Sequence, residues 1–132
     1  MNLDEIRKLF SEASENQSKT LQLYQLLKNE IGESPILLAY RAASEALEAK
    51  HSWNVLTKWA NIDKAMNLFQ KAVNNAPENI EIRFLRYSIQ INTPFILGYS
   101  QNMVEDKQKM KDLFAFADVP LAMKKEIEKI IK

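Results

Sequence analysis

Cysteine is absent from this chain, and glycine is nearly so. The 132 residues include no Cys, two Gly and four Pro. Without Cys the chain has no disulfide framework, no thiolate nucleophile and no Cys-based zinc site. Two glycines are too few for the Gly-rich motifs that cradle phosphates, so the composition also excludes nucleotide binding through such a loop.

An excess of charge of one sign and a long apolar run are missing as well. Eighteen Lys and Arg stand against 17 Asp and Glu, a net charge of +1, so no global field attracts nucleic acid or an anionic membrane. No run approaches the roughly 20 apolar residues of a membrane-spanning helix. The opening MNLDEIRKLF lacks the apolar core of a signal peptide. We therefore expect a soluble cytoplasmic protein with no nucleic-acid or membrane partner, unless an upstream signal sequence has been removed.

What the chain does contain is helical periodicity. Hydrophobic residues make up 46% and charged residues 27%, which suits helices joined by short connections. Apolar residues recur at helical spacing in about seven segments, bounded by capping residues or prolines. These segments are 2–14, 18–32, 34–50, 61–76, 79–92, 100 or 102 to 117, and 118–131. We predict an all-α, single helical-repeat-like domain over residues 1–132, with its helices in antiparallel pairs.

Side chains suited to helix N-caps mark several of the expected starts. The stretch 51–58 breaks the helical pattern and is expected to be a connection, with Trp53 covering part of the core. The expected caps are Ser18, Ser34 before Pro35, Asn61, Asn79, and Asp118 before Pro120.

The segment 79–92 is apolar on two sides, so we expect it to be the central helix. It nevertheless contains Arg83 and Arg86, and a buried arginine must find partners. Two alternatives are open for them. They contact a ligand, or Arg83 pairs internally with Glu81, Asp106 or carbonyls at a helix end.

The predicted fourth helix resembles the second helix of a tetratricopeptide repeat. Its spacing A-x₃-F-x₂-A-x₄-P is the way that helix ends, and residues 74–79 resemble the turn between repeats. The connection at 51–58 replaces the family's upstream Trp and Tyr motif, and Arg83 and Arg86 stand where the family has an aromatic residue and a leucine. The resemblance implies a degenerate, tetratricopeptide-like right-handed stack that acts as a protein-binding scaffold. The residues that carry it are Ala65, Phe69, Ala72 and Pro77.

A second resemblance covers the sequence EIRFLRYSIQINTPFILGYSQN. It is similar to a family of small bacterial proteins that carry an EIRxLR and P-x₂-L-G-Y pattern. That resemblance implies the same helical fold and implies no activity.

The first helices of paired-helix repeats line a concave groove, which points to the predicted third and fifth helices as a binding surface. Arginine donors on these helices would suit a protein or peptide with an acidic or carboxylate-bearing segment. The alternative is a homo-oligomeric structural scaffold, in which the apolar face from Met123 to Ile131 buries against another copy. The candidate partner-binding residues are Arg41, Arg83, Arg86, Tyr87 and Gln90.

No set of residues predicts catalysis, a cofactor or a metal site. His51, the only histidine, has no second imidazole with which to share a metal, and its place near a helix end suits the helix dipole. The carboxylate pairs Glu105–Asp106 and Glu126–Glu128 lie in lysine-rich helices, where we expect solvated faces. We therefore expect a binding protein and not an enzyme.

Overall fold

The protein is all-α in the part of the chain that the structure describes. This computed structural model describes residues 2–13, 15–29, 32, 34–92 and 100–132, without the side chains of residues 100 and 101. Its elements are α1 (Leu3–Ala13), α2 (Gln17–Leu27), α3 (Pro35–Lys50), α4 (Val55–Asn75), α5 (Ile80–Ile91), α6 (Ser100–Leu113), the 3-10 helix η1 (Phe114–Phe116) and α7 (Leu121–Ile131). The predicted all-α class is confirmed, and the tetratricopeptide-like stack of antiparallel pairs stays a prediction. Within those ranges no helix is both long and apolar enough to cross a bilayer.

The caps predicted for α3 and α5 are present. The Ser34 hydroxyl accepts the backbone N–H of Leu37 at 3.5 Å, and Pro35 takes the first helical position. The Asn79 side chain accepts the backbone N–H of Ile82 at 3.1 Å. Each cap satisfies an N–H group that has no carbonyl partner within the helix.

Two other predicted caps are wrong. Asn16, and not Ser18, caps α2, because its side-chain oxygen accepts the backbone N–H of Lys19 at 3.2 Å. Asp118 does not cap α7, which follows Pro120 without a side-chain cap bond. Proline at that position fixes the backbone before the helix, so a capping side chain is not needed to start it.

Helix α4 begins at Val55, six residues before the predicted cap Asn61. The Asn54 side chain accepts the backbone N–H of Thr57 at 3.1 Å and caps the helix instead. The β-branched residues at 55 and 57 lower helix propensity only slightly, and a good cap offsets that. The predicted connection therefore shrinks to four residues, and the expectation that Trp53 covers the core is wrong, since its side chain is 99% exposed.

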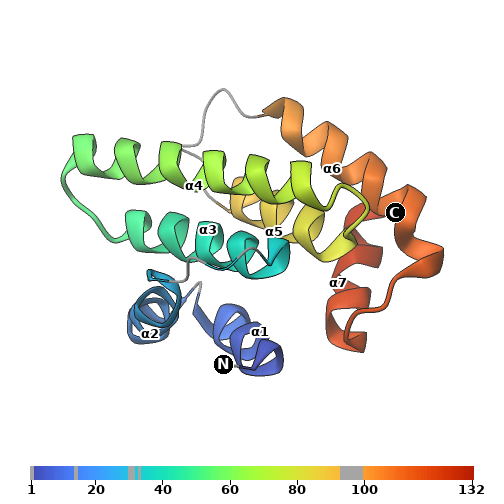
Figure 1. Cartoon of the computed structure of the whole chain (residues 1–132), viewed down its shortest axis with the longest axis horizontal. Helices are drawn as coiled ribbons and strands as arrows, with labels where there is room; N and C mark the ends of the chain where they lie inside the picture. Colours follow the sequence, from blue (N-terminus) through green and yellow to red (C-terminus); the bar gives the residue numbers. More distant parts are fainter. Residues whose placement is uncertain (1, 14, 30–31, 33, 93–99) are drawn as a thin grey trace.

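Helix α3 packs closely on its neighbours because its buried faces are built from alanine. Side chains this small let a second helix approach on more than one side. Helix α3 contacts α2, α4 and α5, as Figure 1 shows for α4 and α5. The alanines that are fully or almost fully buried are Ala39, Ala42, Ala43, Ala46 and Ala49.

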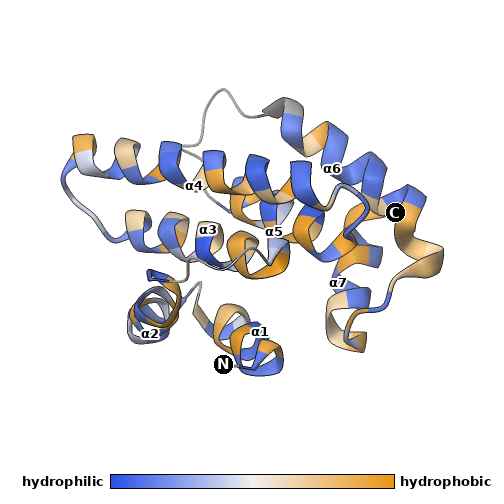
Figure 2. Ribbon diagram, in the orientation of Figure 1, coloured by the Kyte–Doolittle hydropathy of each residue, from blue (hydrophilic) through white to orange (hydrophobic). Residues whose placement is uncertain are grey.

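Helix α5 belongs to two hydrophobic clusters, which agrees with its two apolar sides. The first cluster joins α1 through α5 and includes Tyr40 and Phe69. The second joins α5 to α6 and α7 and includes Met110 and Ile127. Figure 1 shows α5 between the α3–α4 layer and the α6–α7 end of the molecule, and Figure 2 shows hydrophobic faces turned toward it.

Candidate functional site

The side chains of α5 leave the helix toward different neighbours. Successive residues of an α-helix are turned by about 100°, so residues three, four and seven apart share a face. Positions 83, 86 and 90 lie on one such face, and positions 84, 87, 88 and 91 lie on the adjoining one. The first face meets α6, and the second borders an open groove.

The face toward α6 holds a fully buried ion pair. Arg86 donates from Nε to Asp106 Oδ2 at 2.7 Å and from Nη2 to Oδ1 at 2.8 Å, with both side chains 0% exposed. Its Nη1 donates to Gln70 Oε1 on α4 at 3.1 Å. This bidentate geometry fixes α6 against α5, because both hydrogen bonds are kept only in one relative position of the helices.

Arg83 extends the same network. Its Nη1 donates to Glu105 Oε1 at 2.6 Å and to Asp106 Oδ1 at 3.1 Å, and its Nη2 donates to the Pro77 carbonyl at 3.2 Å. The hydrogen bond from Arg83 holds the pKa of Glu105 below its usual range. The structure thus shows the internal pairing with Asp106 and a carbonyl beyond the end of α4. The solvated position expected for Asp106 is wrong.

Glu81 anchors a second buried network on another side of α5. Its carboxylate accepts hydrogen bonds from Arg7 Nε at 2.8 Å and Arg7 Nη2 at 2.7 Å, and also from the Tyr40 hydroxyl. The hydrogen bonds that Arg7 donates to Glu81 raise the pKa of Arg7, and burial, followed by the Glu81 charge, raises the pKa of Tyr40. This network ties α1 and α3 to α5 and occupies the Glu81 carboxylate that the sequence offered to Arg83.

An open groove runs between α1 and α7 across the second face of α5. It consists of two adjoining hollows of about 600 and 280 Å³, which share Phe10, Ser11, Phe84 and Glu126. The larger hollow reaches Met123 on α7, and the smaller one reaches Tyr87 on α5. Apolar and aromatic side chains therefore form its floor, with charged residues along the edges, as is typical of ligand-binding clefts.

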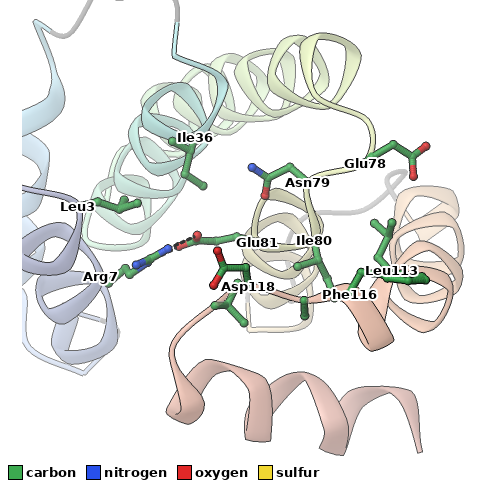
Figure 3. A pocket seen from close by; sticks show the side chains of 12 residues that line it. Leu3, Arg7, Ile36, Glu78, Asn79, Ile80, Glu81, Leu113, Phe116 and Asp118 are labelled. Atoms are coloured by element: carbon green, nitrogen blue, oxygen red, sulfur yellow. Dashed lines mark hydrogen bonds and ion pairs between the residues drawn. The ribbon is translucent and has the colours of Figure 1, made fainter.

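A third hollow of about 350 Å³ adjoins this groove near the N-terminus of α5. Figure 3 shows Arg7 reaching Glu81 between Leu3 and Asp118. Arg7 lines both this hollow and the larger part of the groove. Its guanidinium is engaged by Glu81 and by Asp4 at 3.2 Å, so it serves as a fixed wall between the two.

The groove carries unpaired positive charge. Lys8 on α1 and Lys50 at the end of α3 line it, and neither forms an ion pair with any other residue within the described ranges. Glu126 on the α7 side is paired with Lys129 at 3.3 Å. The two lysines leave the groove with a local excess of cations that the net charge of the whole chain conceals.

Of the predicted partner-binding residues, Tyr87 lines the groove. Arg83 and Arg86 lie on the adjoining face in the network with Asp106, while Arg41 and Gln90 line none of the three hollows described above. Sequence reasoning missed Phe10, Phe84 and Met123 as groove residues, because their spacing is equally that of core positions. Direct contact of the arginines with a partner stays a prediction.

The groove offers binding chemistry and no recognisable reaction centre. In the described part of the chain, no three His, Asp or Glu side chains gather where they could hold a metal ion. His51, the sole imidazole, is exposed and lines none of these hollows. Comparison with protein-family models, curated proteins and solved structures finds no match to this chain.

Proposed function

We propose that this protein is a protein- or peptide-interaction module whose groove between α1 and α7 binds an amphipathic segment bearing acidic residues. The observation that carries the proposal is the continuous groove itself, with an aromatic and apolar floor and two unpaired lysines at its edges. Apolar anchors would supply affinity on the floor formed by Phe10, Phe84 and Met123. Carboxylates on the partner would meet Lys8 and Lys50.

The helix order supports this placement of the binding surface. If α1–α2, α3–α4 and α5–α6 are the antiparallel pairs of a tetratricopeptide-like stack, then α1, α3 and α5 are the first helices of those pairs. These three helices, followed by α7, contribute all the residues of the two groove hollows but two, Asn92, which directly follows α5, and Pro120, which directly precedes α7. The proposed site thus keeps the concave surface expected from the repeats and moves the polar readers from Arg83 and Arg86 to Lys8 and Lys50.

A selection of short random peptides on the full-length protein tests this function. We expect enriched peptides to combine apolar anchors with Asp or Glu. The double variant Lys8→Glu, Lys50→Glu should bind them about tenfold more weakly, since each attraction becomes a repulsion.

The matched control is Lys71→Glu, Lys111→Glu, which reverses two exposed lysines on α4 and α6 that line none of the hollows. Its affinity should stay within about twofold of the wild type. Equal losses in both double variants, or enrichment of basic peptides, would contradict the proposed site.

The alternative of a homo-oligomeric scaffold is not supported by any particular contact. The apolar residues of α7 that would meet another copy already pack within the second cluster, where Ile127 is 0% exposed and Met123 and Ile130 are partly buried. The face is therefore partly covered inside the molecule, and the alternative stays a prediction.

A further inference from the structure

Four large apolar side chains are exposed at the beginning of α4 and just before it. We call them the tryptophan tip: Trp53, Val55, Leu56 and Trp59, which are 99%, 63%, 81% and 39% exposed. Both tryptophans of the chain lie in it. A monomeric protein rarely leaves a contiguous apolar patch in water unless that patch meets something.

The tip lies where the beginning of α4 extends beyond the end of α3 (Figure 1). The Asn54 cap fixes the backbone of the first turn of α4, on which Val55 and Leu56 stand. Figure 1 shows this end of α4 at one extreme of the long axis, and Figure 2 shows hydrophobic residues there.

The tip stands apart from the two hydrophobic clusters and from the groove. None of its four residues belongs to either hydrophobic cluster or lines any of the three hollows described above. A stable protein partner usually needs a matching surface of about 800 Å² on each side. A lipid bilayer needs no matching surface, because its interface accepts protruding apolar and aromatic side chains.

The charged and titratable residues nearest to the tip in the sequence are basic. The stretch 49–62 contains Lys50, His51 and Lys58, and the acidic residues Glu48 and Asp63 stand at its two ends. Tryptophan beside leucine and lysine is the composition found where proteins meet the headgroup region of a membrane. Lysines near an anionic bilayer add an attraction that salt weakens.

From the exposed apolar side chains and the basic residues near them, we propose that the tryptophan tip inserts into the interfacial region of a bilayer containing anionic lipid. The expected absence of a membrane partner rested on the small net charge of the whole chain and on the lack of a long apolar run. Neither describes the local composition of the tip. The tip and α7 lie at opposite ends of the long axis in Figure 1, while Lys50, which lines the groove, lies close to the tip in the sequence.

The two tryptophans make the test direct, because all tryptophan fluorescence of the chain comes from the tip. The full-length protein is mixed with vesicles of phosphatidylcholine alone, or of phosphatidylcholine with phosphatidylglycerol, and both flotation and emission are followed. We expect co-flotation and a shift of emission to shorter wavelength with the anionic vesicles, both decreasing as salt is raised.

The variant Leu56→Ser should lower the vesicle partition coefficient about tenfold. Leu121→Ser is its matched control, because Leu121 is a leucine 68% exposed at the start of α7, and its partition should be unchanged. Absence of flotation with anionic vesicles, or equal losses in the two variants, would overturn the proposal. An emission shift on raising protein concentration without lipid would instead assign the tip to a second copy of the chain, and would also overturn it.

Discussion

One buried carboxylate, Asp106, is the residue on which the joint between α5 and α6 depends. It accepts hydrogen bonds from both Arg83 and Arg86 and is 0% exposed. Its charge offsets two guanidinium groups that are themselves removed from water. Replacing an ion network by apolar groups can be neutral, whereas removing one member leaves the others unpaired, and that is costly.

The variant Asp106→Asn keeps the shape of the side chain and removes its charge. We expect a loss of about 3–5 kcal/mol in the free energy of unfolding, measured by urea denaturation followed by circular dichroism. Glu105→Gln is the control, because Glu105 also contacts Arg83 but its side chain is 55% exposed, and it should lose less than about 1 kcal/mol. Similar losses in the two variants would mean that burial of Asp106 does not make its charge essential.

Through Tyr40, the stability of the network around Glu81 depends on pH in the alkaline range. Burial and the Glu81 charge raise the pKa of Tyr40 above its usual 10.0. The unfolded chain releases this proton near that usual value while the folded protein retains it. The stabilisation from the raised pKa is therefore complete below pH 10.0 and is lost above it, at about 1.4 kcal/mol per pH unit.

The variant Tyr40→Phe should lose about 1.5–3 kcal/mol near neutral pH, because a hydrogen bond to the buried Glu81 carboxylate is gone. It also lacks the titrating hydroxyl. The difference in unfolding free energy between wild type and variant should therefore narrow between about pH 9 and about pH 11. A difference that stays constant over that range, in denaturant titrations at each pH, would contradict the raised pKa.

At the scale of the element, the sequence predicts where α4 ends but not where it begins. The end of this helix before Pro77 and its buried face are visible in the sequence. Its first turn is not, because Asn54 and Asn61 are equally good caps and only packing decides between them. The earlier start of α4 also goes with an exposed Trp53, which the sequence predicted to cover part of the core.

Exchanging each candidate cap tests where α4 begins. Asn54→Ala should lower the unfolding free energy by about 1 kcal/mol, because Asn54 accepts the Thr57 N–H. Asn61→Ala, inside the helix, should change it by less than about 0.5 kcal/mol or raise it slightly, since alanine is the better helix former. Thermal or urea unfolding of the two variants in parallel measures both, and the opposite order would place the start of α4 at the later residue.

Helix α5 likewise has features that the sequence predicts and others that only the packing decides. The caps, length and double apolar character of this helix are readable from its sequence. Which neighbour covers which side is not, because Asp106 lies 20 residues from Arg86 in the chain, on a helix whose lysines predict a solvated surface. Periodicity indicates that Arg83 and Arg86 share a face but cannot indicate that α6 covers it.

At the scale of the whole molecule, the groove could not have been found from the sequence. Its lining comes from α1 and α7, near opposite ends of the chain, and from α3 and α5 between them. Each apolar lining residue taken alone has the spacing of an ordinary core position. The resemblance to paired-helix repeats implies a concave surface on the first helices, and Tyr87 is the predicted partner-binding residue that lines the groove.

The two proposals assign the molecule two surfaces for two kinds of contact. The groove is a hollow with Lys8 and Lys50 in its lining, whereas the tryptophan tip is an exposed apolar patch at the beginning of α4 (Figure 1). Lys50 links them, because it lines the groove and also lies shortly before the tip in the sequence. A protein of this design would hold a bound acidic segment close to a membrane.

The most direct test of the central claim, that the groove is the binding site, is methyl NMR of the methionines with a selected acidic peptide. Met123 lines the groove, whereas Met66 and Met110 are 3% and 0% exposed in the two clusters. The groove predicts that the Met123 methyl signal shifts on peptide addition while those of Met66 and Met110 stay in place. A shift of Met110, beside the Arg83 and Arg86 face, with Met123 unchanged would contradict it.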